Sequence, residues 1–263
     1  MDNIFIRFFR QSILSYKALF GFLDPKIYFL VKVINPIMQL VFFSLIARYI
    51  HHTSDITPWV IGNAFLLSIY NALFGVGTVM VSERSFGTLQ LVVASTANNF
   101  LIFIGRAFIH IFDATATVII GLTVGYLFFE LDFSNTNFLL LIICIIITMF
   151  SSIGVGLLLG SMGLVSRDLN LIMNTAVFVL MIFSGAQFPI SNLPLLLSKV
   201  SYYIPITRGI EASRLIIDGN ITVHVFNLLG GEALIGIIYM MLGYFTLRIF
   251  EYISKKKATL DIY

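Results

Sequence analysis

Charged residues are scarce in this sequence, and their scarcity excludes a soluble protein. Only 11% of the 263 residues are Asp, Glu, Lys or Arg, whereas ordinary globular chains carry roughly 25%. Cysteine is rarer still, because Cys144 stands alone inside an apolar run. A single cysteine excludes a disulfide framework and any multi-cysteine metal site.

Motifs for catalysis and nucleotide binding are also missing. The chain has no G-x-x-x-x-G-K-[ST] and no Gly-Lys pair, so it cannot bind nucleotide phosphates through a P-loop. It has neither H-E-x-x-H nor G-x-S-x-G. The adjacent His51 and His52 have only Asp55 nearby and do not indicate a metal site. We therefore expect a chain that is no enzyme by itself, binds no cofactor or metal, and has no nucleic-acid partner.

Long apolar stretches fill the rest of the sequence. Hydrophobic residues make up 59% of the chain and include 26 Phe, and the mean hydropathy is +0.98. In hydrocarbon every backbone N–H and C=O has to be bonded internally, so an apolar run of about 20 residues is best satisfied as one spanning helix. The expected fold is therefore all-α, a polytopic membrane protein that forms a single transmembrane domain over 1–263.

Gaps between charged residues locate six spans. Three gaps contain no charge and predict helices at 57–81, 137–163 and 169–188. Three further apolar runs include charges and predict helices at 27–47, 100–129 and 227–250. Most of these charges lie near the expected helix ends, where long side chains reach the membrane surface; they are Lys32, Arg106, Glu232 and Arg248.

The distribution of Lys and Arg predicts the orientation. An even number of spans places both ends of the chain on one side, and the positively charged side is the cytoplasmic one. Twelve of the 16 Lys and Arg residues fall on the side of the termini, and only Arg48, Lys199, Arg208 and Arg214 fall opposite. We therefore expect a multi-pass protein of the cell membrane with both termini in the cytoplasm. Residues 1–10 lack the apolar core of a signal peptide.

Two cytoplasmic segments have patterns of their own. Residues 1–22 place aromatic and aliphatic side chains at helical spacing, namely Phe5, Phe9, Ile13, Tyr16 and Phe20. This pattern predicts an amphipathic interface helix, which either anchors span 1 or also contacts a cytoplasmic partner. Residues 82–99 are longer than the roughly 2 to 8 residues of an ordinary helix connection. A short helix parallel to the membrane would fit them.

The segment 189–220 is apolar but broken. It carries three prolines, Pro189, Pro194 and Pro205. Broken backbone at membrane depth is tolerated only where protein or a water-filled cavity surrounds it. We expect a pair of short re-entrant helices on the outer side.

Polar residues inside the spans are the candidates for function, because each costs free energy unless it faces protein or water. Asn35 and Gln39 lie one turn apart in span 1, and Asn174 lies in span 5. They either form hydrogen bonds between helices or line a substrate path.

A second group of polar residues lies on one face of span 3, where Arg106, His110 and Asp113 follow at spacings of four and three. They form either a structural network or a proton relay.

Three motifs resemble those of the ABC-2 type permease family, the membrane subunits of ATP-driven exporters. The first is Glu83-Arg84 followed by Gly87-Thr88-Leu89, and the second is Ser184-Gly185 with Phe188-Pro189-Ile190 and Leu193-Pro194. The third runs from Pro205 to Arg214 as PITRGIEASR. The similarity covers nearly the whole chain.

The resemblance implies six helices, an interface helix, a coupling helix after span 2 and re-entrant outer helices after span 5. It assigns coupling to the ATPase to Glu83, Arg84, Gly87, Thr88, Leu89 and Gln90. It assigns the outer re-entrant motif to Gly185, Phe188, Pro189, Pro194, Pro205, Arg208 and Glu211. It places the substrate path between spans 1 and 5 of two protomers, for which we select Asn35, Gln39, Phe42, Phe43, Asn174, Phe178 and Gln187.

The resemblance also implies partners. These are two copies of an ATP-binding cassette ATPase, which binds ATP and Mg, a second permease copy, identical or related, and membrane lipid. The E-R-x-x-G-T-L stretch is more similar to exporters of drugs, antibiotics and peptides than to those of polysaccharides. Export of a polysaccharide or lipid-linked glycan is the alternative, and a proton-coupled secondary transporter using Asp113 is an alternative from another class.

Overall fold

The fold is an all-α bundle. The computed structural model describes residues 10, 12–14, 16, 17, 21, 24–53, 55–85, 87, 99–164, 166 and 168–257. Within these ranges no strand occurs, and five helices are long and apolar enough to cross a membrane. A sixth apolar helix, α8 (Leu169–Phe183), has only 15 residues. The expected all-α polytopic membrane protein is confirmed.

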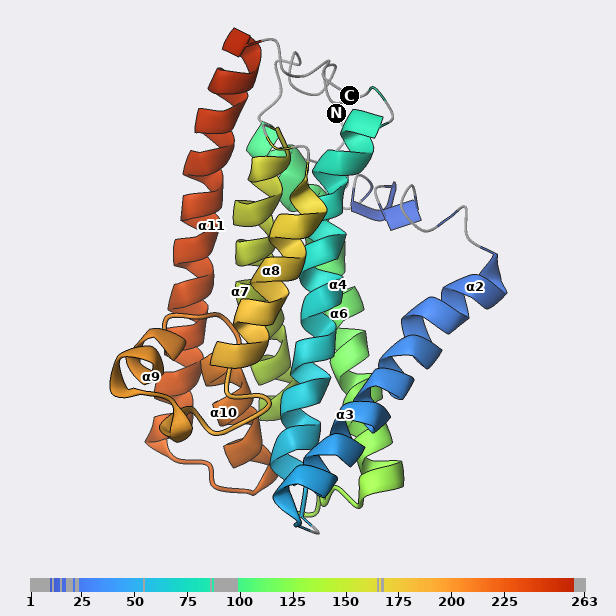
Figure 1. Ribbon diagram of the computed structural model, residues 1–263, viewed down its shortest axis with the longest axis vertical. Helices are drawn as coiled ribbons and strands as arrows, with labels where there is room; N and C mark the ends of the chain where they lie inside the picture. Colours follow the sequence, from blue (N-terminus) through green and yellow to red (C-terminus); the bar gives the residue numbers. More distant parts are fainter. Residues whose placement is uncertain are drawn as a thin grey trace.

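The first span is continuous but not uniform. It runs as α2 (Pro25–Phe29), a π-helical turn η1 (Leu30–Ile34) and α3 (Asn35–His51). The carboxylate of Asp24 caps it by accepting a hydrogen bond from the Lys26 N–H at 2.8 Å. The wide turn ends just before Pro36, which cannot donate a helix hydrogen bond, so the proline accounts for the change of geometry. In Figure 1 α2 leans away from the other helices.

The other long helices are α4 (Thr57–Ser85), α6 (Asn99–Phe129), α7 (Phe138–Ser161) and α11 (Val223–Lys257). A 3₁₀ turn, η2 (Met162–Leu164), extends α7. Asn137 caps α7 by accepting from the Leu140 N–H at 3.1 Å. Helix α4 continues to Ser85, beyond its predicted end at 81. Helix α11 starts at Val223 and ends at Lys257, so it extends past both ends of the predicted span 227–250. Polar residues at the ends of an apolar run are still helical here.

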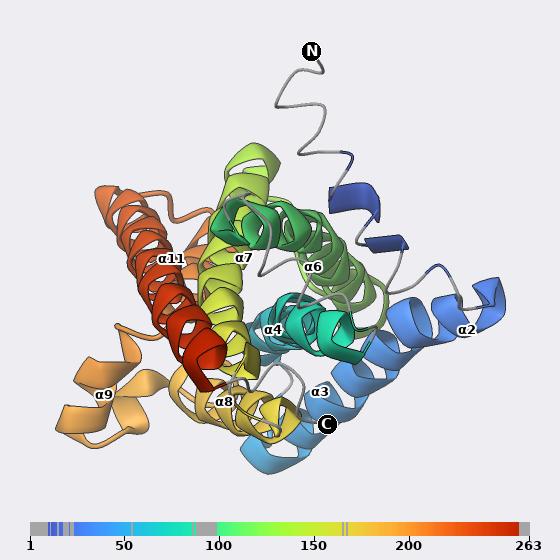
Figure 2. The same ribbon diagram turned by 90° about the horizontal axis from the view of Figure 1, so that it is seen from above.

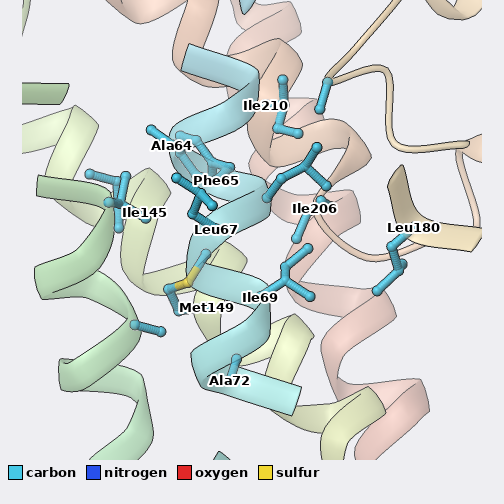
Figure 3. Close-up of a cluster of buried hydrophobic side chains, with 14 of the residues drawn as sticks. Ala64, Phe65, Leu67, Ile69, Ala72, Ile145, Met149, Leu180, Ile206 and Ile210 are labelled. Carbon is cyan, nitrogen blue, oxygen red and sulfur yellow. The ribbon is translucent and has the colours of Figure 1, made fainter. Parts of the chain in front are cut away.

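Helix α4 lies at the centre of the bundle. Seen from above, α3, α6, α7 and α8 surround it, and α11 packs on the far side of α7 (Figure 2). Figure 3 shows the core where Phe65 and Ile69 of α4 lie near Met149 of α7. The two helices approach closely because a glycine of α7, Gly156, packs against Val76, and an added Cβ would come within 3.1 Å of the valine Cβ.

Short elements follow α8 and fold back on the bundle. They are η3 (Ile190–Asn192), α9 (Leu195–Ser201) and α10 (Thr207–Ile217). Helix α10 packs against α4, α7 and α11, whereas α9 lies at the edge of the bundle (Figure 1). The predicted span 169–188 therefore ends five residues early, at Phe183. Gly185 explains this, because its φ of +74° leaves the helix, and a Cβ there would meet Ile190 at 2.8 Å.

Candidate functional site

A cavity of about 350 Å³ lies between α3, α4 and α8. Its described walls are aromatic and aliphatic side chains with three amides, and none of the described lining residues is charged. The lining residues are Gln39, Phe42, Phe43, Asn63, Leu66, Leu67, Tyr70, Val177, Met181 and Gln187. This combination of apolar walls and a few polar groups is typical of sites for small molecules.

The amide of Asn63 is the most buried polar group in this cavity, with 1% of the residue exposed. Its Oδ1 accepts a hydrogen bond from Gln187 Nε2 at 2.6 Å, and the Gln187 carbonyl accepts from Trp59 Nε1 at 2.9 Å. Among the described residues the Asn63 Nδ2 has no hydrogen-bond partner. Asn63 is therefore, among the described lining residues, an amide with a buried donor that no protein acceptor uses. The sequence reasoning missed Asn63, although an amide within a charge-free span is the same signal that selected Asn174.

Four of the seven path residues predicted from the sequence meet at this cavity, namely Gln39, Phe42, Phe43 and Gln187. Asn35 lies next to it, because its Oδ1 accepts from Gln39 Nε2 at 2.9 Å. The other two, Asn174 and Phe178, lie on the exposed face of α8. The Asn174 side chain donates to the Asn170 carbonyl of its own helix at 2.9 Å. The structure thus places Asn174 and Phe178 away from the cavity and from the two amides of span 1, Asn35 and Gln39.

A buried ion pair joins spans 1 and 3. Lys32 Nζ donates to Asp113 Oδ2 at 2.6 Å, and the two side chains are 9% and 11% exposed. The predicted position of Lys32 at the membrane surface is therefore wrong. Asn71 of α4 accepts from the same Nζ at 3.3 Å, and Tyr16 donates to the other carboxylate oxygen at 3.2 Å. Helical periodicity within one span could not identify this cation, because it comes from another helix.

Two further residues were predicted in this network. His110 is fully buried in α6 and packs against Gly75 of α4, where an added Cβ would lie 2.3 Å from its Nδ1. The ring of Tyr16 lies 5.9 Å from the His110 ring. The backbone of Arg106 belongs to α6, but its side chain lies outside the described part, so its predicted role stays a prediction. The structure therefore places His110 in helix packing beside the ion pair.

Arg214 fixes the outer segment to the bundle. Its guanidinium donates to the Pro58 carbonyl at 2.6 and 3.1 Å and to the Gly185 carbonyl at 3.0 Å. Burial lowers the pKa of Arg214 to about 10, and the carboxylates of Glu211 and Asp218 oppose this shift. The group remains charged at neutral pH. One side chain thus satisfies carbonyls at the start of α4 and at the end of α8.

Glu232 fixes the other end of α10 and is fully buried within α11. Its Oε1 accepts from the Ile206 N–H at 2.7 Å and from the Ser151 hydroxyl. The predicted position of Glu232 at the membrane surface is therefore wrong. Ile206 has φ +72°, a strained conformation for a β-branched residue, just before α10 begins. Arg208 lies across Gly231, where an added Cβ would be 2.7 Å from its Nη1.

The other residues predicted for the outer motif lie in or between the short helices that follow α8. Pro189 precedes η3, and Pro194 directly precedes α9. Pro205 is buried, and Phe188 is half-buried. Glu211 faces His224 of α11, with 3.4 Å between Oε1 and Nε2. These positions build a folded outer layer, and none of them lines the cavity.

The predicted coupling residues are mostly beyond what the structure describes. Glu83 and Arg84 belong to the last turn of α4, and Gly87 has φ +68° in the turn that follows. Thr88, Leu89 and Gln90 lie outside the described residues. The coupling assignment thus stays a prediction. In the described part of the chain no group of three or more His, Cys, Asp or Glu could hold a metal.

A helical membrane bundle with an uncharged, aromatic cavity between its spans has the features of a transporter membrane domain. The family model for the ABC-2 type transporter matches residues 12–217. The chain therefore belongs to the ABC-2 type transporter family, whose matched region is a transport permease domain and not a nucleotide-binding domain. The resemblance seen in the sequence is confirmed. No curated protein matches the chain.

Proposed function

We propose that this chain is the permease subunit of an ABC exporter that moves an amphiphilic molecule, such as a drug, an antibiotic or a peptide. The observation that carries the proposal is the cavity between α3, α4 and α8. Its aromatic walls favour apolar parts of a cargo, and the Asn63 Nδ2, which has no partner among the described residues, favours one hydrogen-bond acceptor once a cargo reaches it. The lining contains no charge, so a strongly charged cargo would be desolvated without compensation.

Partners supply what the chain lacks. Because the sequence has no P-loop, ATP and Mg are bound by two copies of a separate ATP-binding cassette ATPase in this proposal. A second permease copy, identical or related, forms the other wall of the path. Exposed apolar side chains on α3 and α8 support this, since Phe42 and Phe178 are 59% and 61% exposed. Both termini face the cytoplasm, and lipid of the cell membrane surrounds the rest.

Two alternatives have less support. A polysaccharide or lipid-linked glycan needs many hydrogen-bond partners along its path, and the cavity offers three amides and one tyrosine. A proton-coupled carrier needs a carboxylate that exchanges protons during transport, whereas Asp113 is paired with Lys32 at 2.6 Å. The transport experiment distinguishes both alternatives from the proposed exporter.

Transport by the reconstituted complex tests the role of the cavity. The chain and its ATPase would be placed in proteoliposomes with an uncharged dansyl-labelled hydrophobic peptide as the probe. We expect uptake to require ATP and to persist when the proton gradient is collapsed. Asn63→Leu should raise the probe concentration for half-maximal uptake about tenfold, the effect of one lost hydrogen bond worth about 1.4 kcal/mol.

Asn227→Leu is the matched control, because it removes the same amide from an exposed position of α11 outside the cavity. Equal effects of the two variants would reject the cavity as the binding site. Uptake by the chain alone, driven by an imposed pH gradient and abolished by Asp113→Asn, would replace the ABC proposal with the carrier. Uptake of an oligosaccharide but not of the peptide would favour the glycan alternative.

We also propose that 82–94 transmits force from the ATPase, since this segment mixes an apolar side with charges in the longest cytoplasmic connection of the sequence. Replacing Glu83 and Arg84 together by alanine should leave membrane insertion intact. It should lower transport and the substrate-stimulated ATPase activity of the complex by tenfold or more, about 1.4 kcal/mol of lost coupling. Normal transport by the double variant would reject this assignment.

A further inference from the structure

A second cavity, of about 560 Å³, opens between α6, α7 and the loop that joins them. It shares no lining residue with the cavity described above. One wall contains Ile119 and Tyr126, two helical turns apart on α6, and the other contains Phe138 and Ile145 at the same spacing on α7. We refer to this cavity as the α6–α7 groove. Its rim is open, because Ile119, Tyr126 and Phe138 are 47%, 59% and 58% exposed.

The interior of the groove is apolar. Leu122, Leu141 and Ile145 are buried at its base, with at most 6% exposed. Thr123 also lines it, but its hydroxyl donates to the Ile119 carbonyl at 2.8 Å and needs no other acceptor. A molecule in this groove therefore meets hydrocarbon and aromatic rings. Its natural occupant is an alkyl chain.

The length of the groove favours a lipid chain over a protein helix. Seven residues separate its ends along each helix, which corresponds to about 10 Å. The hydrocarbon core of a bilayer is about 30 Å thick, so the groove extends over part of one leaflet only. A spanning helix of a partner would need a seam along most of that thickness.

The mouth of the groove carries negative charge. Asp132 lies there, and its Oδ1 accepts from the Ser134 N–H at 2.9 Å and from the Ser134 hydroxyl. These hydrogen bonds lower the pKa of Asp132, so the carboxylate is ionised at neutral pH. Glu130 lies in the same loop but is not among the described residues that line the groove, and the sequence has no Lys or Arg between Arg106 and Arg167. A phosphate without a compensating amine is repelled here, and an ammonium group is attracted.

We propose that the α6–α7 groove binds a membrane lipid with an amine-bearing headgroup, from the leaflet that the α6–α7 loop faces. One acyl chain lies between Ile119 and Ile142, and the amine lies at Asp132. The proposal depends on neither the transported molecule nor the direction of transport. It assigns the far side of the bundle from α3 and α8 to lipid recognition.

Competition between two lipids tests the proposal. The purified full chain in detergent would be incubated with equal amounts of phosphatidylethanolamine and phosphatidylglycerol that carry identical acyl chains. Retained lipid would be counted by native mass spectrometry. We expect about fivefold more phosphatidylethanolamine than phosphatidylglycerol, as for a favourable exposed ion pair.

Variants separate the groove from general surface charge. Asp132→Asn should bring the ratio to about one, while Glu130→Gln, the same change of charge two residues away, should leave it near fivefold. Thr123→Phe should fill the groove and remove both lipids, and Ile142→Trp is the second filling variant if the first does not fold. Equal retention of the two lipids by the unmodified chain would overturn the proposal. So would equal effects of Asp132→Asn and Glu130→Gln, or full retention by the filled variants.

Discussion

Asp113 is the residue at which three parts of the chain meet. Lys32 of span 1 binds one of its carboxylate oxygens, and Tyr16 of the N-terminal region binds the other. The Tyr16 hydroxyl also lies 2.7 Å from that of Tyr28, at the start of span 1. Span 1 and the segment before it are therefore both fixed to span 3 through one carboxylate. Because the ion pair is buried, each charge depends on the other for its stability.

Removing either member of the pair should be costly, and removing both should cost less. Asp113→Asn and Lys32→Met should each lower the free energy of unfolding by about 3 to 5 kcal/mol, because the remaining charge is buried without its partner. The double variant should lose no more than either single variant, since no unpaired charge remains. Thermal unfolding in detergent would measure this cycle. Losses that simply add would show that the pair is not coupled.

Sequence reasoning found these polar residues but not their partners. Lys32 and Glu232 both interrupt apolar runs, and proximity to a helix end suggested that they reach the membrane surface. The partner of Lys32 lies 81 positions away, and that of Glu232 lies on the turn before α10. Periodicity within one helix describes its own faces only. It does not show which face a distant helix covers. The ion-pair partner of Lys32 and the hydrogen-bond partner of Glu232 could therefore be identified only in the structure.

At the scale of elements, two buried polar side chains hold the ends of α10, Glu232 of α11 at its start and its own Arg214 near its end. Glu232 of α11 binds the Ile206 N–H where the chain is strained, and Arg214 binds carbonyls of α4 and of the α8 end. These contacts satisfy backbone groups that hydrocarbon could not. The two contacts therefore fix the proline-rich segment between α8 and α11 to the bundle.

The Glu232 contact predicts a difference between two substitutions. Glu232→Leu should lower the free energy of unfolding by about 3 kcal/mol, because the buried Ile206 N–H loses its acceptor and the Ser151 hydroxyl keeps only the Thr148 carbonyl. Glu232→Gln keeps one oxygen in the same place and should cost about 1 kcal/mol. Thermal unfolding and proteolysis at the turn before α10 would both report the change. A larger loss for glutamine than for leucine would show that the acceptor is unimportant.

Helices were easier to predict than their ends. Charge-free runs marked the spans because hydrocarbon tolerates few unpaired charges, and α4 and α7 both begin at capping residues near the predicted positions. The hydrocarbon thickness limits the apolar run but not the helix, so α4 and α11 continue into polar sequence. The early end of α8 depends on the backbone of Gly185, and hydropathy does not record backbone angles.

At the scale of the whole molecule, one copy leaves apolar faces of α3 and α8 uncovered. Phe42 borders the cavity while most of its surface is exposed, and Phe178 lies on the outward face of α8. A second permease copy against these faces would enclose the cavity from the membrane. The exposure of both rings therefore fits the proposed path between two copies.

Thiol labelling tests this arrangement with little background, because the native Cys144 is buried. Phe42→Cys and Phe178→Cys should react with a membrane-permeant maleimide at rates that differ severalfold with and without ATP in the reconstituted complex. Phe112→Cys, on an exposed position of α6, is the control and should react at one rate. Rates at the first two positions that never change with nucleotide or peptide probe would argue that these side chains only pack.

Helix α8 has 15 residues and is about 22 Å long, which is shorter than the roughly 30 Å of bilayer hydrocarbon. The bilayer has to thin beside it, or polar groups have to enter the membrane there. The Arg214 guanidinium, bound at the Gly185 carbonyl, places a charged group directly beyond the end of this short helix. In the proposed path, a cargo that moves along α8 crosses an apolar barrier of about three quarters of the usual thickness.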